Sequence, residues 1–291
     1  MATVRQWIDG ARPRTLPAAL APVAVGTGVA AADGTVIAWR ALAALFVALA
    51  LQIGVNYAND YSDGIRGTDA DRVGPFRLVG SGAARPAAVK TAAWGAFTAA
   101  AAIGLTLAAV TSWWLVAVGA AAIGAAWFYT GGSRPYGYRA LGELSVFVFF
   151  GLVAVVGTSY VQLERVTGLA ILAAIPVGVL ACALLVANNL RDIPTDRAAG
   201  KRTLAVLLGD RASRRLYLGL LATAFGMAVV IAMMRTPWAL LALVAAPAAV
   251  GPARAVRSGA SGRALIPVLQ GTARTQLAFG LLLAVGLTLA G

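Results

Sequence analysis

"ALFVALALQIGVNYANDYSDGIRGTDADR", residues 44–72, passes directly from an apolar run into an acidic one. The apolar part has the composition expected near the end of a membrane-spanning helix. The polar part holds Asp60, Asp63, Asp69 and Asp71, which are four of the chain's eleven acidic residues. Carboxylates are expensive inside a bilayer, so a cluster at the end of such a segment predicts a functional site there.

The composition of the whole chain predicts a polytopic membrane protein. Its 291 residues are 60% hydrophobic and only 12% charged, whereas soluble domains are about 25% charged. The net charge of +13 could suggest nucleic acid, but the basic residues stand in short loops between apolar runs, so no nucleic-acid partner is expected. The chain has one cysteine, Cys182, and no histidine, which excludes a disulfide framework and the usual transition-metal ligands.

Nine apolar segments are long enough to cross a bilayer, and backbone hydrogen bonding makes helices their expected form. We therefore predict an all-α single domain over residues 1–291 with nine transmembrane helices. The segments are residues 15–32, 37–57, 88–110, 113–130, 141–161, 167–189, 214–234, 237–253 and 271–290. The eighth is the shortest and contains Pro247.

The distribution of basic residues predicts the orientation. A cytoplasmic N-terminus places 21 of the 24 Lys and Arg residues on the cytoplasmic side, and only Arg40, Arg165 and Arg235 outside. Every acidic residue except Asp33 and Glu164 falls on the same inner side. An odd number of spans then leaves the C-terminus external, and any polar site is expected to face the cytoplasm.

The first acidic cluster begins at the end of the second apolar segment. Its spacing puts four polar residues on one helical face: Asn56, Asn59, Asp60 and Asp63. Gly64 and Gly67 are expected to end the helix, which leaves Asp69 and Asp71 in the loop.

The second cluster, "NNLRDIPTDRAAGKRTLAV", residues 188–206, follows the sixth apolar segment. Asn188, Asp192 and Asp196 are spaced i, i+4, i+8 along it. Pro194 disfavours helix at the residue before it, so Asp196 is expected on a kink or in the loop.

Two matching Asn/Asp clusters at the ends of separate helices suggest one divided metal site. Oxygen ligands without His or Cys favour Mg²⁺ or Ca²⁺, and Mg²⁺ commonly joins carboxylates to substrate phosphates. Basic residues follow each cluster and could bind the anion: Arg66, Arg72, Arg77, Lys201 and Arg202. The alternative is a set of solvated helix-end charges. We assign Asp71 beside Arg72, and Asp210 beside Arg211, to such ordinary loop pairs.

The chain resembles the UbiA superfamily of intramembrane prenyltransferases, which have nine transmembrane helices and two Asp-rich motifs on cytoplasmic loops. The first motif, N-D-x-x-D-x-x-x-D, matches Asn59, Asp60 and Asp63, but Gly67 stands at its last position and Asp69 follows two residues later. The second, D-x-x-x-D, matches Asp192 and Asp196.

Within the superfamily, four stretches are most similar to the 1,4-dihydroxy-2-naphthoate polyprenyltransferase (MenA-type) family. They are "RPRTLPAALAPVAVGTG" at 12–28, "NYANDYSDGIRGTDADRVGPFRLV" at 56–79, "YTGGSRPYGYRALGE" at 129–143 and "NNLRDIPTDRAAGKRTLAV" at 188–206.

The resemblance implies Mg²⁺-dependent transfer of a polyprenyl chain from its diphosphate to 1,4-dihydroxy-2-naphthoate. Carbon dioxide and diphosphate would be lost, giving demethylmenaquinone for menaquinone biosynthesis, at a bacterial plasma membrane whose lipid surrounds the tail. Asp60, Asp63, Asp192 and Asp196 are then the expected catalytic and metal-holding carboxylates. Further candidate metal ligands are Asn56, Asn59, Asn188 and Asp69. Lys201 and Arg202, followed by Arg66 and Arg77, are the expected diphosphate contacts. No obligate protein partner is evident.

The "GGSRPYGYR" loop, residues 131–139, is a third polar element on the same predicted side. Its Arg134, Tyr136, Tyr138 and Arg139 are candidate contacts to the acceptor or caps over the site; an interfacial aromatic-basic anchor is the alternative. Arg14 and Asn189 are two more candidate acceptor contacts, although positive-inside topology also accounts for Arg14.

Other functions remain open from the residues alone. A different acceptor, such as 4-hydroxybenzoate, homogentisate, haem or a sugar phosphate, would use the same metal site. A CDP-alcohol phosphotransferase signature begins to match at Asp63 and Gly64 but fails at Gly67. A secondary transporter would place its ion site near the middle of the membrane, whereas these carboxylates stand at helix ends.

Overall fold

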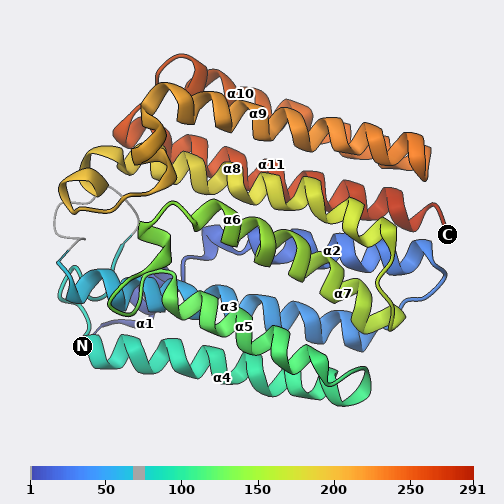
Figure 1. The fold of residues 1–291 in the computed structure, drawn as a ribbon, viewed down its shortest axis with the longest axis horizontal. Helices are drawn as coiled ribbons and strands as arrows, with labels where there is room; N and C mark the ends of the chain where they lie inside the picture. Colours follow the sequence, from blue (N-terminus) through green and yellow to red (C-terminus); the bar gives the residue numbers. More distant parts are fainter. Residues whose placement is uncertain (1, 68–75) are drawn as a thin grey trace.

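The computed structural model describes residues 2–67 and 76–291 of the chain and is helical (Figure 1). The predicted site residue Asp69, and the predicted pair of Asp71 and Arg72, lie outside these described ranges. The long helices run side by side along the molecule. In chain order the elements are α1 (Val4–Ala11), η1 (Pro13–Thr15), α2 (Pro17–Ala32), α3 (Ala38–Ile65), α4 (Pro86–Val110), α5 (Trp114–Phe128), η2 (Tyr136–Tyr138), α6 (Gly142–Val146), η3 (Phe147–Val153), α7 (Ala154–Leu163), α8 (Gly168–Ala198), α9 (Leu204–Met234), η4 (Pro237–Ala245), α10 (Ala246–Arg257), η5 (Gly262–Leu265) and α11 (Ile266–Thr288).

Each of the nine predicted apolar segments falls on helix. By length and composition, seven helices among the described residues could cross a membrane, and an eighth is possible if the bent pair Val4–Thr15 and Pro17–Ala32 counts as one span. The remaining segment corresponds to α5, which is apolar but shorter, with 15 residues. The chain is therefore an all-helical protein with multiple candidate membrane spans, and the count of nine remains a prediction.

Three predicted helix ends were wrong. α3 continues through Gly64 to Ile65, and only Gly67, with a φ of +70°, lies beyond the end. α8 continues through Pro194 to Ala198, so Asp196 lies inside the helix and not in a loop. α9 begins at Leu204, about ten residues before the predicted start, with a break at Gly209. In the sequence, each apolar run ends where charged residues begin. The helix itself continues beyond that point.

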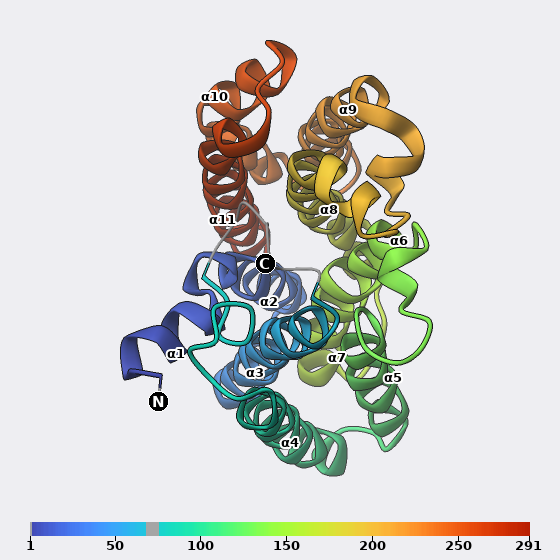
Figure 2. The same ribbon diagram turned by 90° about the vertical axis from the view of Figure 1, so that its left-hand side faces the viewer.

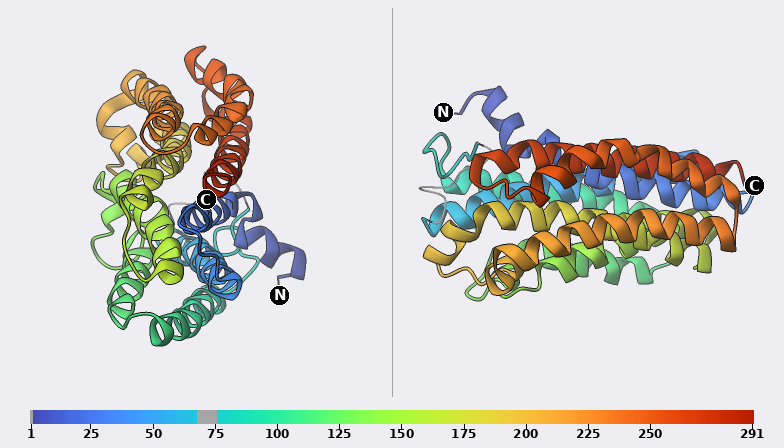
Figure 3. Two further views of the ribbon diagram at one scale, coloured as in Figure 1. Left: turned by 90° about the vertical axis from the view of Figure 1, so that its right-hand side faces the viewer. Right: turned by 90° about the horizontal axis from the view of Figure 1, so that it is seen from above.

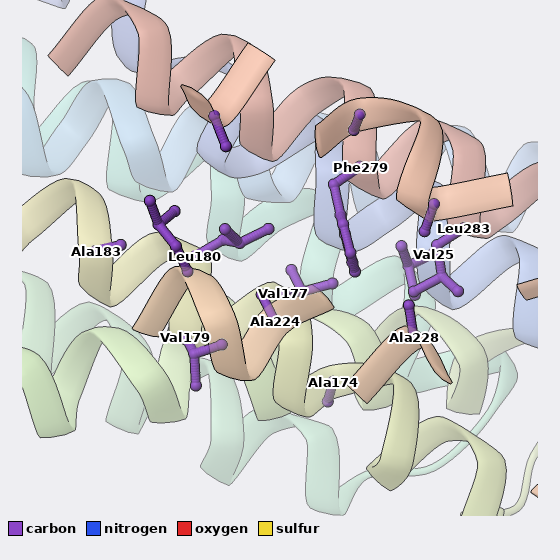
Figure 4. Close-up of a cluster of buried hydrophobic side chains, with 14 of the residues drawn as sticks. Val25, Ala174, Val177, Val179, Leu180, Ala183, Ala224, Ala228, Phe279 and Leu283 are labelled. Atoms are coloured by element: carbon purple, nitrogen blue, oxygen red, sulfur yellow. The ribbon is translucent and has the colours of Figure 1, made fainter. Parts of the chain in front are cut away.

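α8 lies at the centre of the packing. In its most apolar stretch 67% of the residues are buried, against 28% in α3. Val177 and Leu180 of α8 pack in one core with side chains of α2, α9 and α11 such as Val25, Ala224 and Phe279 (Figure 4). Many core residues are alanines, which let helices approach closely where lipid supplies no hydrophobic driving force.

The span from Gly142 to Leu163 contains a π-helical segment, η3, between the α-helical segments α6 and α7. A π-helix is wider than an α-helix, and such segments are often found at functional sites. Gly151 of η3 meets Gly178 of α8 so closely that a Cβ atom on Gly151 would lie 2.7 Å from the Gly178 Cα. η3 is thereby held directly against the central helix.

The two ends of the molecule differ in chemistry. The N-terminus lies at one end together with the connections that follow α3, α5 and α8, and the C-terminus lies at the other (Figures 1 and 3). Figure 2 looks onto the end that carries these connections. At the opposite end, Arg165 pairs with Asp33, and Arg40 pairs with Glu164 at 2.7 Å. The two acidic residues predicted to lie apart from the others are thus neutralised locally.

Candidate active site

A cavity of about 760 Å³ lies among α2, α3, α5, the α6–α7 span and α8. Its polar lining comes from the two Asn/Asp clusters and the connections near them: Asn56, Asn59, Asp63, Arg77, Tyr138, Asn188, Asn189, Arg191, Asp196 and Lys201. Its apolar lining includes Val47, Leu51, Leu107, Val118, Phe149, Phe150, Val153, Val161 and Leu184. One cavity therefore combines a charged region with a long apolar one.

Asp63 is the centre of the charged region. Its carboxylate accepts a hydrogen bond from the Tyr138 hydroxyl and one of 3.2 Å from the Lys201 ammonium. The Arg77 guanidinium lies 3.7 Å from its other oxygen. All three partners come from connections far from Asp63 in the chain, so this one carboxylate gathers three connecting segments over the end of α3.

Lys201 is a buried cation in the site, only 7% exposed. Besides the contact with Asp63, its Nζ lies 4.6 Å from the centre of the Tyr138 ring. Its backbone N–H donates to the carbonyl of Asp196 at 2.8 Å, which fixes the chain just after α8. A buried ammonium held by one carboxylate and one aromatic face is well placed to receive an anion.

Asp60 has a different environment from Asp63. Its side chain is fully buried, and its two oxygens accept the backbone N–H groups of Leu78 at 2.7 Å and Val79 at 3.0 Å. It does not line the cavity. Gly64, one turn later, leaves room for this segment, because a Cβ there would lie 2.4 Å from Val79 Cγ1. The structure thus shows Asp60 fastening residues 78–79 to α3.

The two asparagines of the first cluster line the cavity and also hold neighbouring chain segments. The Asn56 amide donates to the Ala11 carbonyl at 2.9 Å and to the Thr15 hydroxyl at 3.0 Å. The Asn59 carbonyl accepts from the Thr130 hydroxyl at 2.8 Å. Arg14, from the N-terminal segment that Asn56 holds, also lines the cavity.

In the second cluster, as in the first, one carboxylate lines the cavity and the other is paired outside it. The Asp192 carboxylate forms a buried two-point pair with Arg191, at 2.6 and 2.7 Å, and Arg191 also donates to Asn188 at 2.9 Å. Asp192 lies outside the cavity lining, whereas Asn188 and Asp196 belong to it. Because the helix continues through Pro194, Asp196 projects from the last turns of α8.

Several arginines that were predicted as diphosphate or acceptor contacts lie away from the cavity. Arg66 donates to the backbone carbonyls of Thr130 and Gly132, where it ties the end of α3 to the connection after α5. Arg134, Arg139 and Arg202 line a separate concavity, which shares Tyr138 with the main cavity. Asp210 pairs with Arg214, four residues on, and not with the predicted Arg211.

Tyr136 lines the cavity but uses its hydroxyl locally. The hydroxyl donates to the Ala125 carbonyl at 2.8 Å and lies 2.8 Å from the Ser145 hydroxyl. Burial raises the pKa of Tyr136, so the phenol stays protonated at neutral pH. Its structural effect is to hold the connection after α5 against the start of the α6–α7 span.

A buried carboxyl lies behind the cavity. Glu143 of α6 is 9% exposed, and its Oε1 accepts from the Asn189 side-chain amide at 3.0 Å. Its Oε2 is buried and has no hydrogen-bond partner among the described residues. Asn189 lines the cavity, so Glu143 fixes the rotation of that amide. The sequence held one signal for this role, a lone acid at the start of an apolar segment.

The donor set allows Mg²⁺ only together with a phosphorylated substrate. No group of three or more carboxylate, His or Cys side chains lies close enough to hold a metal within residues 2–67 and 76–291. Asp63 and Asp196 are the carboxylates of the two Asn/Asp clusters that line the cavity, and the amides of Asn59 and Asn188 also belong to its lining. One or two carboxylates, with phosphate and water completing the shell, is the usual protein environment of Mg²⁺.

Comparison with known proteins identifies related chains over nearly the whole length. A model of the UbiA prenyltransferase family matches residues 19–264. The 1,4-dihydroxy-2-naphthoate octaprenyltransferase of Mycobacterium tuberculosis is 58% identical, with 98% of this chain and 97% of that protein covered. The protein of the same name from Escherichia coli is 39% identical, with 97% and 95% covered.

Solved structures share the fold at low sequence identity. A UbiA homologue from Aeropyrum pernix superposes with a TM-score of 0.73 at 14% identity, covering 92% of this chain and 97% of that one. A UbiA homologue from Archaeoglobus fulgidus bound to DMAPP and Mg²⁺ gives a TM-score of 0.66 at 14% identity, covering 96% and 99%.

Proposed function

The chain belongs to the UbiA prenyltransferase family, and from this premise we propose that it is a 1,4-dihydroxy-2-naphthoate polyprenyltransferase of menaquinone biosynthesis. It transfers the polyprenyl group of a polyprenyl diphosphate to the dihydroxynaphthoate ring, with loss of carbon dioxide and diphosphate. The observation that carries this function is the 58% identity, over nearly the full length of both chains, to an enzyme of that name. The cavity supplies both a charged region and an apolar region for such a substrate pair.

The charged region binds the diphosphate. Lys201 and Arg77, held together by Asp63, face the leaving group as the allylic C–O bond breaks. Asp63 and Asp196 would hold Mg²⁺ with the side-chain oxygens of Asn59 and Asn188. When bound, Mg²⁺ neutralises the charge that develops on the departing diphosphate. A requirement for Mg²⁺ is supported by the archaeal UbiA homologue whose structure holds DMAPP and Mg²⁺.

The apolar region binds the isoprenoid and keeps water from the reacting carbon. Phe149 and Phe150 bring aromatic faces into the cavity, where they can stabilise an allylic cation. The electron-rich ring attacks that cation, a carbon–carbon bond forms, and the ring carboxylate leaves as carbon dioxide. No strong base is needed, which agrees with a chain that contains no histidine.

An assay with purified protein tests the function. With polyprenyl diphosphate, dihydroxynaphthoate and Mg²⁺, a prenylated naphthoquinol is expected, which air oxidises to the naphthoquinone during work-up, and EDTA should lower the rate at least about 100-fold until Mg²⁺ is restored. Parallel reactions with 4-hydroxybenzoate test the acceptor and should give no product. Undiminished turnover in EDTA, or preference for 4-hydroxybenzoate, would contradict the proposal.

The orientation follows from charge. Nine spans with a cytoplasmic N-terminus place the cavity's charged region at the cytoplasmic surface of the plasma membrane, next to soluble dihydroxynaphthoate. A reporter enzyme that folds only outside the cytoplasm is expected to be active when fused after Gly291 and inactive when fused in the α8–α9 connection. The reverse pattern would overturn this orientation.

Glu143 positions the acceptor through Asn189. By holding the Asn189 N–H, it leaves the Asn189 carbonyl oxygen to accept a hydroxyl of the naphthoate ring. Glu143→Leu should raise KM for dihydroxynaphthoate about tenfold, the effect of losing one hydrogen bond to a charged group. Glu143→Gln keeps an acceptor for Asn189 and should restore most of the affinity.

Steady-state kinetics with each substrate varied in turn separates this role from general damage. KM for the polyprenyl diphosphate should stay within about twofold of wild type in both variants, because the side-chain hydrogen bond of Glu143 goes to Asn189 and not to Lys201 or Arg77. Equal increases in both KM values, or a Gln variant no better than Leu, would show that Glu143 acts only on the fold.

A further inference from the structure

A second concavity, of about 480 Å³, lies beside the active-site cavity. Its lining includes Arg134 and Arg139 of the α5–α6 connection and Arg202 of the α8–α9 connection. Tyr138 lines both concavities and so stands between them. None of these three arginines lines the active-site cavity, so the diphosphate site does not explain their convergence.

The backbone holds the three arginines together. The Arg202 N–H donates to the Tyr138 carbonyl at 3.0 Å, and residues 139 and 202 form an isolated parallel β-bridge. Two connections from distant parts of the chain are therefore joined with their guanidinium groups around one hollow. Each arginine is exposed and could have pointed away if the connections had been independent.

The concavity has an unbalanced positive charge. Among the residues that the structure describes, none that lines it is acidic. Within the described part of the chain, no hydrogen bond or ion pair involves the side chains of Arg134, Arg139 or Arg202. Three like charges held around one hollow repel each other, and an anion in the hollow removes that cost. The planar guanidinium fork matches phosphate oxygens in particular.

The border of the concavity is apolar on the side of the helices. Leu207 belongs to the lining and is 53% exposed. Leu208 is 44% exposed beside it, and Leu141 and Leu144, which follow Arg139, are 46% and 61% exposed. In a protein with multiple membrane spans, exposed leucines at the starts of α6 and α9 are expected to face lipid. They therefore indicate the depth in the bilayer at which the acyl chains begin. A phosphate group bound here would have hydrocarbon next to it.

From this juxtaposition we propose that Arg134, Arg139 and Arg202 form a binding site for the phosphodiester headgroup of an anionic phospholipid, distinct from the diphosphate site. The arginines bind the phosphate and the leucines contact the acyl chains. Basic pockets at the membrane surface are known to select anionic headgroups in this way. The site does not depend on the identity of the prenyl acceptor.

Native mass spectrometry of the purified protein with added lipid tests the proposal. The variant R134Q/R139Q/R202Q is compared with R254Q/R257Q/R263Q, which removes the same charge from exposed positions on and after α10. With phosphatidylglycerol, wild type and the control triple should retain bound lipid, and the pocket triple should lose at least about tenfold in affinity. With phosphatidylcholine all three proteins should bind equally weakly.

The remaining outcomes would overturn the proposal. Equal loss of phosphatidylglycerol from both triples would mean that surface charge alone attracts the lipid. If inorganic diphosphate, titrated in detergent, bound wild type and was lost from the pocket triple while phosphatidylglycerol binding was unchanged, the arginines would serve a soluble anion. Should the pocket triple fail to fold, R139Q against R257Q gives the same comparison, with a smaller expected loss of about threefold.

Discussion

Asp63→Asn is expected to lower kcat at least about 1,000-fold while the protein remains folded. The asparagine keeps the shape of the side chain and an oxygen for the Tyr138 hydroxyl, but it cannot balance the charges of Lys201 and Arg77. It also removes one of the two carboxylates that are proposed to hold Mg²⁺ in the cavity. The effect therefore combines a weaker metal site with a displaced cation beside the leaving group.

The matched control for this variant is Asp210→Asn. Asp210 makes the same kind of contact, a carboxylate with an arginine, but it is exposed and lies outside the cavity. Turnover of that variant should stay within about twofold of wild type, since exposed pairs contribute little. Both proteins would be compared by product formation and by size-exclusion profile. An Asp63→Asn enzyme that kept a tenth of wild-type turnover would show that the proposed site is misplaced.

Asp60→Ala is expected to damage the fold. Removing the carboxylate leaves the N–H groups of Leu78 and Val79 buried without acceptors. Each such group costs about 1–3 kcal/mol, so Tm in detergent should fall by roughly 10 °C. Asp60→Asn should be intermediate, because an amide offers one acceptor oxygen and not two.

The same variant separates two roles for Asp60. The sequence motif predicts a metal-holding carboxylate, whereas the structure shows a carboxylate that fastens a connecting segment. A protein with Asp60→Ala that kept the wild-type Tm but lost all turnover would favour the metal role and contradict the stability prediction. A lowered Tm, with Mg²⁺ affinity unchanged in protein that remains folded, would favour the fastening role.

Much of this architecture could be predicted from hydropathy and spacing. Apolar runs located the helices, because a bilayer requires long apolar segments that satisfy their own backbone groups. Of the residues in the two predicted Asn/Asp clusters, Asn59, Asp63, Asn188 and Asp196 line one cavity, whereas Asp60 and Asp192 do not. Helix ends were harder, since Pro194 was expected to interrupt a helix that in fact runs on to Ala198.

The direction of individual side chains could not be predicted from helical spacing. Asp60 meets residues 78–79, a contact that depends on how a connection folds back, whereas Asp192 pairs with its neighbour Arg191 on α8. Lys201 and Arg202 were predicted as a joint clamp. Residues 201–203 are not helical and alternate buried, exposed, buried. In extended backbone neighbouring side chains point to opposite sides, so Lys201 enters the cavity and Arg202 faces the second concavity.

The π-helical segment η3 sets the rotational phase of the span that contains it. Each residue of an α-helix advances the side chains by about 100°, and η3 lies within the run of residues by which this span lines the cavity. Phe149 and Phe150 lie within it, whereas Gly157, Thr158 and Val161 follow it and line the same cavity. Removing one residue from η3 would turn the second group away from the cavity without altering any of its side chains. The shape of the apolar chamber is thus encoded partly in residue count, a property that substitution scanning alone does not detect.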